Sequence, residues 1–172
     1  MDLRSEILAE HSRAQSLRIA KWIGRDTRRF QQLLDLFLYD EYRVVQRSAW
    51  VMRLVAEKHP ALLSPHLPVI VGRMEEAGVP VAVKRNVLGV LQELPLPENL
   101  HGPVMNSCFA FLEDPQETVA VKSFAMTILA RLAIHYPDIK NEIRLLIADQ
   151  LENNPTPGIQ SKARKVLKEL KA

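Results

Sequence analysis

The side chains best suited to catalysis or metal binding are few in this sequence, and they are scattered. None of the histidines forms the i, i+4 pair or the cysteine–histidine cluster that holds zinc. No glycine-rich phosphate loop and no G-x-S-x-G nucleophile motif occurs. We therefore expect no catalytic residue, no metal and no cofactor, and the chain is predicted not to be an enzyme. The histidines are His11, His59, His66, His101 and His135.

The single cysteine, Cys108, lies in an apolar stripe with helical spacing. A reactive thiolate needs exposure and nearby positive charge, so we expect Cys108 to be a buried small hydrophobic residue. One cysteine excludes a disulfide framework and favours a reducing compartment. No stretch approaches the roughly twenty apolar residues of a membrane span, and the N-terminus has no signal-peptide core. The predicted location is cytoplasmic, with no membrane contact.

Basic residues are concentrated at the two ends of the chain. Residues 1–29 carry seven Lys or Arg against four Asp or Glu, and residues 157–172 carry five against one. The N-terminal set either contacts phosphates or forms the solvated face of a terminal helix. A net charge of only +3 favours the solvated face. The set is Arg13, Arg18, Lys21, Arg25, Arg28 and Arg29.

The elements that must position these side chains are helices, because the same pattern of apolar positions occurs four times, at intervals of 38 residues. Each copy has the i, i+4, i+7, i+11 spacing of one helix face, and all sixteen positions are apolar. Equal intervals of this kind are typical of a repeat array whose units bury each other's faces. The four sets are Val45, Ala49, Met52, Ala56; Val83, Val87, Val90, Leu94; Val121, Ala125, Ile128, Leu132; and Ile159, Ala163, Val166, Leu170.

A second apolar face lies between these A helices and predicts a B helix in each unit. The predicted fold is an all-α superhelix, or solenoid, of about four hairpins of roughly 38 residues within one domain, residues 1–172. Residues 27–156 hold the hairpins, and residues 157–172 form a C-terminal capping helix. The B faces are Phe30, Leu33, Leu34, Phe37; Leu67, Ile70, Val71, Met74; Met105, Cys108, Phe109, Leu112; and Ile143, Leu146, Ile147, Gln150.

Capping residues predict where several helices begin. Thr156 precedes Pro157, and Gly102-Pro103 falls where the third B helix is expected to start. Asp114, with Glu117 three residues later, has the pattern of a capping box. Residues 1–26 lie outside the repeat register and are expected to form a cap. They are either one kinked helix or two short helices, the second beginning after Ser12.

The segment Asp114-Pro115, Val119, Val121-Lys122 and Ala125 resembles the A-helix signature of HEAT repeats. The resemblance extends over about residues 27–172, with weaker copies around Val45 and Val83. It departs from the pattern at residues 78–80, where no Asp turn occurs, and at Ile159-Gln160. It implies a scaffold or peptide-binding surface. A few members of the family bind nucleic acid, and rare ones are DNA-repair or chromophore-attaching enzymes.

The resemblance also implies that a partner lies along the concave face formed by the B helices. One column flanking the predicted B-helix core changes from basic through apolar to acidic, which suits an extended peptide or a partner's helix. Phe111 in this column is either an aromatic anchor or a packing residue. The favoured function is a non-enzymatic protein-interaction or scaffold module, and the alternative is a nucleic-acid-binding or DNA-repair solenoid. The column consists of His66, Arg73, Val104, Phe111, Glu142 and Asp149.

Overall fold

The computed structural model describes all 172 residues, which form helices without any strand. The predicted all-α class of helical-hairpin repeats is confirmed. Two compact units divide the chain, unit 1 (Met1–Val90) and unit 2 (Leu91–Ala172). All sixteen residues of the repeated A-helix stripe are buried.

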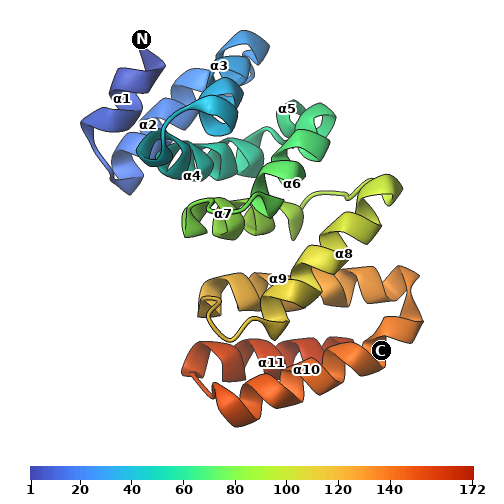
Figure 1. Ribbon diagram of the computed structural model, residues 1–172. Helices are drawn as coiled ribbons and strands as arrows, with labels where there is room; N and C mark the ends of the chain where they lie inside the picture. The colour runs from blue at the N-terminus through green and yellow to red at the C-terminus, as the bar shows by residue number, and fades with distance from the viewer. The chain divides into compact units, whose positions relative to one another are not determined.

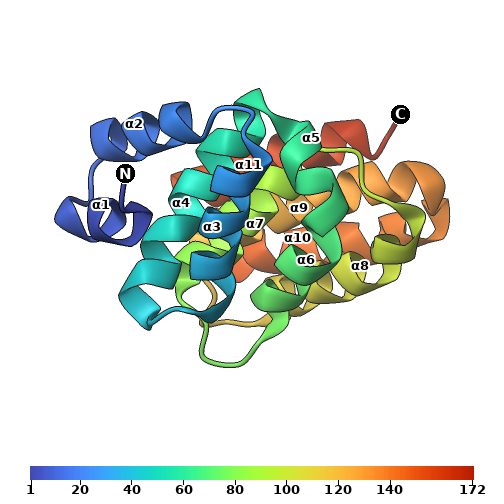
Figure 2. The ribbon, with the colours of Figure 1, turned by 90° about the horizontal axis from the view of Figure 1, so that it is seen from above.

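Unit 1 is assembled around α4, which packs against α1, α2 and α3 (Figures 1 and 2). Helix α4 buries residues on two faces, from Val44 and Val45 to Val55 and Ala56. The predicted B face of α3, from Phe30 to Phe37, is completely buried. The elements of this unit are α1 (Leu3–Ala9), α2 (Arg13–Ile23), α3 (Thr27–Tyr39), α4 (Tyr42–Lys58), α5 (Pro60–Leu63), the 3-10 turn η1 (Ser64–His66), α6 (Leu67–Glu75) and α7 (Val81–Leu91), whose last residue belongs to unit 2.

Unit 2 is assembled in the same way around α9, which lies between α8 and α11 (Figure 1). Within unit 1, α2 packs against α4 as α9 packs against α11 in unit 2. The N-terminal segment therefore supplies a helix that takes the place of an A helix, although it lies outside the 38-residue register. The elements of unit 2 are α8 (Glu98–Glu113), α9 (Val119–His135), the 3-10 turn η2 (Pro137–Ile139), α10 (Lys140–Asn153) and α11 (Pro157–Glu169).

Residues 1–26 contain two helices, so the two-helix alternative for this segment is the one observed. The Ser12 hydroxyl accepts a hydrogen bond from the Gln15 backbone N–H at 3.1 Å and starts α2. Thr156 starts α11 as predicted, with its hydroxyl 3.2 Å from the Ile159 nitrogen.

Two predicted helix starts are wrong. Helix α8 begins at Glu98, so Pro103 lies inside it, because Pro97 takes the N-cap position and an acidic residue occupies the first turn. Asp114 is the C-cap of α8 and not the N-cap of α9. Its carboxylate accepts from the Gln116 backbone N–H at 2.8 Å, which is a local turn. Thr118 caps α9 instead.

Arginine side chains tie neighbouring helices together by donating hydrogen bonds to carbonyls at helix ends, where no intrahelical partner remains. In unit 1, Arg47 of α4 donates to the Ile7 and Leu8 carbonyls of α1 at 3.1 and 2.9 Å. In unit 2, Arg144 of α10 donates to the Leu170 carbonyl at 2.9 Å. These bonds satisfy backbone acceptors that would otherwise be left without a donor.

A buried polar chain joins three helices of unit 2. The Lys122 amino group of α9 donates to the Gln150 side-chain oxygen of α10 at 3.0 Å. The Gln150 side-chain nitrogen donates to the Leu112 carbonyl of α8, also at 3.0 Å. Lys122 is 2 % exposed and Gln150 is 3 % exposed, so water cannot replace either bond. Gln150, the one polar residue on the predicted B faces, is thus a structural link.

An ion pair fastens α1 to the residues that follow α3. The Nε–H of Arg4 is shared between both carboxylate oxygens of Asp40, at 3.0 and 3.2 Å, and Nη2 donates to Oδ1 at 3.1 Å. The hydrogen bond from Arg4 is the main reason why the pKa of Asp40 lies below its ordinary value. The folded form therefore prefers the ionised carboxylate more strongly than the unfolded chain does.

We expect replacement of Arg4 by methionine to make the stability of the protein less sensitive to acid. The Asp40 contribution is present above its ordinary pKa and is lost as the pH falls through the lower, folded-state value. Urea unfolding at neutral and acidic pH measures this loss in wild type and variant. Arg13→Met is the matched control, because Arg13 is exposed and forms no ion pair. Equal acid sensitivity in wild type and Arg4→Met would contradict the expectation.

Candidate functional site

In unit 1, two residues of the predicted B-helix column are occupied by contacts within the protein. The ring of His66 lies 5.7 Å from that of Phe30, centroid to centroid. Arg73 donates from Nε to the Phe37 carbonyl at 3.4 Å and forms an ion pair with Glu76. Both residues are half-buried. These contacts support the packing of the helix hairpin. They leave the two side chains little free surface and few free donors with which to bind a partner.

In unit 2, the structure corrects the prediction for Val104, which is fully buried and offers no surface to a partner. The physical reason is that α8 is rotated about its own axis relative to the prediction. The residues that it buries follow one another at intervals of four. Met105 and Phe109, predicted to be core residues, are consequently only half-buried, as is Phe111. Glu142 and Asp149 are exposed. The buried face of α8 is Leu100, Val104, Cys108 and Leu112.

Cys108 is the buried small hydrophobic residue that its position in the sequence predicts. Its side chain is completely inaccessible, and burial raises the pKa of its thiol. The thiolate needed for nucleophilic chemistry is therefore disfavoured.

The basic N-terminal set is divided by the structure. Arg18 forms an ion pair with Glu6. Arg29 lies over the ring of Trp22, 4.4 Å from its centroid, and donates to the Trp22 carbonyl at 2.6 Å. These two side chains have structural roles. The remaining four are exposed and form no ion pair; they are Arg13, Lys21, Arg25 and Arg28.

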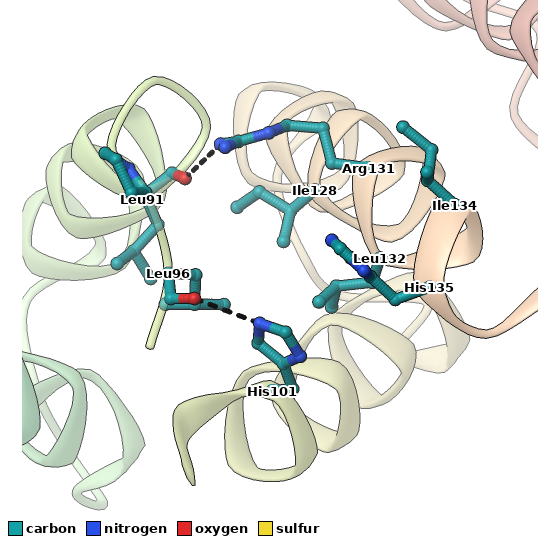
Figure 3. A pocket seen from close by; sticks show the side chains of 9 residues that line it. Leu91, Leu96, His101, Ile128, Arg131, Leu132, Ile134 and His135 are labelled. Atoms are coloured by element: carbon teal, nitrogen blue, oxygen red, sulfur yellow. Dashed lines mark hydrogen bonds between the residues drawn. The ribbon is translucent and has the colours of Figure 1, made fainter. Parts of the chain in front are cut away.

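Hollows occur beside the C-terminal ends of α4 and α9, and sequence reasoning missed them. One in unit 2, the connector pocket, lies between α9 and the chain that joins α7 to α8, and its volume is about 300 Å³ (Figure 3). A second in unit 2, the α9–α11 pocket, has a volume of about 490 Å³. A third in unit 1, the α2–α4 pocket, has a volume of about 430 Å³. No periodic signal marks them, because they depend on the distance between helices.

Two polar side chains hold the wall of the connector pocket in place (Figure 3). Arg131 donates to the Leu91 carbonyl at 2.7 Å (Figure 3). It also donates to the Leu94 carbonyl at 3.1 Å. The Nε2 atom of His101 lies 3.0 Å from the Leu96 carbonyl oxygen (Figure 3). Its Nδ1 atom lies 3.0 Å from the Tyr136 hydroxyl oxygen. Because a carbonyl oxygen only accepts, Nε2 must carry a hydrogen.

Ile134 and Arg131 are the residues that the two pockets of unit 2 share. Ile134 belongs to α9 and is 76 % exposed, the most exposed aliphatic side chain among the large apolar residues on the surface. His135 lines the connector pocket, and Lys140 and Glu169 line the α9–α11 pocket. An exposed apolar residue between two hollows with a mainly basic rim is suited to binding another molecule. We call this set the Ile134 surface.

The structure contains no group of three or more His, Cys, Asp or Glu side chains placed to bind a metal ion. None of the helices combines the length and the apolar character needed to cross a bilayer.

Comparison with known proteins adds one finding. A family model described as a HEAT repeat domain matches residues 3–170. The match starts 24 residues earlier than the resemblance visible in the sequence motifs, and it includes α1 and α2. No curated protein and no solved structure matches the chain.

Proposed function

Since the chain belongs to the HEAT repeat family, we propose that it is a non-enzymatic protein-interaction module that holds a partner protein on the Ile134 surface of unit 2. HEAT repeats generally serve as scaffolds or protein-binding units. The observation that supports this place is the 76 % exposure of Ile134 between two hollows. An exposed apolar side chain that lies beside pockets able to take a partner's side chains is typical of the centre of a protein interface.

The test compares two exposed apolar residues of unit 2. Ile134→Asp places a charge in the proposed interface, whereas Leu145→Asp places the same charge on α10, where Leu145 is 64 % exposed and lines neither pocket. Affinity capture from the native cells, with nuclease treatment and mass spectrometry, is expected to recover a protein with wild type and Leu145→Asp. The same protein should be lost with Ile134→Asp. Its recovery with both variants, or recovery of no discrete protein, would refute the proposal.

The B helices are a second place where a partner could bind. Glu142 and Asp149 are exposed on α10 and retain the acidic end of the column predicted from the sequence. A Glu142→Lys/Asp149→Lys double variant in the same capture assigns binding to this face if the partner is lost there and retained by Ile134→Asp.

Nucleic-acid binding is the alternative function, and the observation that favours it is the exposed, unpaired state of Arg13, Arg25 and Arg28. Binding driven by phosphate contacts must weaken steeply as salt is raised, because counterions are released on association. A salt titration with a labelled oligonucleotide, for wild type and an Arg13→Glu/Arg25→Glu/Arg28→Glu variant, tests it. Weak binding that is insensitive to both salt and the substitutions would eliminate this alternative.

A further inference from the structure

We propose that the α2–α4 pocket of unit 1 is a second binding site, which takes an acidic segment of a partner protein through one large apolar side chain. The site is separate from the Ile134 surface, because all the residues that line it belong to unit 1. The apolar side chain enters the pocket, and neighbouring carboxylates of the segment meet the lysines at its rim.

The floor of the pocket is apolar and comes from two helices. Leu17 and Ala20 of α2 face Leu54 and Val55 of α4. Ala20 is the smallest residue of this lining, and it lies where α2 packs against α4. The volume of about 430 Å³ lies in the lower part of the range for ligand pockets, roughly 300–1,000 Å³. It is sufficient for one bulky side chain and too small for a folded element.

The rim of the pocket is basic. Lys21 is in the last turn of α2, Lys58 is in the last turn of α4, and His59 follows α4 directly. Both lysines are exposed and form no ion pair. No carboxylate lines the pocket, and residues 11–25 contain no Asp or Glu. The charge that complements this rim is negative.

The apolar floor and basic rim favour a peptide that has both apolar and acidic side chains over a phosphate group. Both helices end beside the pocket, and the carbonyl end of a helix carries partial negative charge. A phosphate placed deep in the pocket would be repelled there, whereas an apolar group would not. The floor also has no polar side chain to orient a small molecule, which ligand pockets normally provide. The long, flexible lysines can instead reach carboxylates outside the pocket.

The experiment selects peptides from a displayed library of random dodecapeptides on the immobilised full chain. Enriched peptides are then labelled with fluorescein, and their affinities are measured by anisotropy. We expect them to combine a bulky apolar residue with adjacent Asp or Glu. A Lys21→Glu/Lys58→Glu variant should bind them at least about tenfold more weakly, since both rim charges are reversed. Wild-type affinity should fall only modestly as salt is raised.

The matched control is Arg25→Glu/Arg28→Glu, which makes the same charge change on exposed residues of unit 1 that do not line the pocket. It should bind the peptides like wild type, as should Ile134→Asp, so failure here is distinguishable from failure of the proposed function. Far-ultraviolet circular dichroism establishes that each variant is folded. Three results would overturn the proposal: no enrichment over an unrelated protein, enriched peptides without acidic residues, or equal weakening by both double variants. Complete competition by a single-stranded oligonucleotide would reassign the site to phosphate.

Discussion

Replacement of Gln150 by leucine is expected to lower the free energy of unfolding by about 3 kcal/mol, because two buried polar groups lose their partners at once. The Lys122 amino group loses its acceptor, and the Leu112 carbonyl loses its donor. Leucine fills a similar space, so the loss reports hydrogen bonding and not a cavity. Urea unfolding followed by circular dichroism measures the change.

The double variant Lys122→Met/Gln150→Leu should be more stable than Gln150→Leu alone. Removal of both side-chain partners leaves only the Leu112 carbonyl unsatisfied, and the remaining loss is expected to be about 1 kcal/mol. Gln116→Leu, at an exposed glutamine of unit 2, is the control and should change stability by less than about 0.5 kcal/mol. If the effects of Lys122→Met and Gln150→Leu were simply additive, the buried bond between them would contribute nothing.

Replacement of Phe37 by alanine is expected to have the largest effect of any change considered, a loss of about 4 kcal/mol in the free energy of unfolding. Phe37 has no exposed surface and lies on the face of α3 that is buried in unit 1. Truncation removes its buried apolar area and leaves a cavity that the surrounding helices can fill only in part. Both tryptophans, Trp22 and Trp50, belong to unit 1, so tryptophan fluorescence in urea follows the relevant unit.

Tyr39 provides a control two residues further along the same helix. Its side chain is 81 % exposed, and Tyr39→Ala should change stability by less than about 0.5 kcal/mol. Similar losses for the two substitutions would mean that helix propensity, and not core packing, determines the stability of α3. A loss below about 1 kcal/mol for Phe37→Ala would mean that the cavity collapses almost completely.

The core of the repeats could be predicted from the sequence because it depends on a local regularity. An apolar position that recurs with the period of a helix must face its neighbours, whatever their distance. Val45, Val83, Val121 and Ile159 mark the same position in four helices, and all four are buried. The equal interval between them then identifies a repeat array, and the family follows from it.

Helix ends were less predictable, because several local signals compete for the same residues. Thr156 starts a helix, as its type and the following proline indicate. Asp114 has an equally good capping pattern, but its carboxylate closes a turn after α8. Only the path of the chain between α8 and α9 decides which hydrogen bond the side chain makes.

The sequence by itself determined the class of fold, the length of the repeat and most of the buried face of each helix, since these follow from periodicity along one helix. The tertiary structure alone decided which surface residues are available. Val104 is buried because of the rotation of α8, and Arg73 is occupied by the carbonyl of Phe37 in a neighbouring helix. The hollows around Ile134 and between α2 and α4 likewise arise from the spacing of helices that are distant in sequence, for which no local pattern exists.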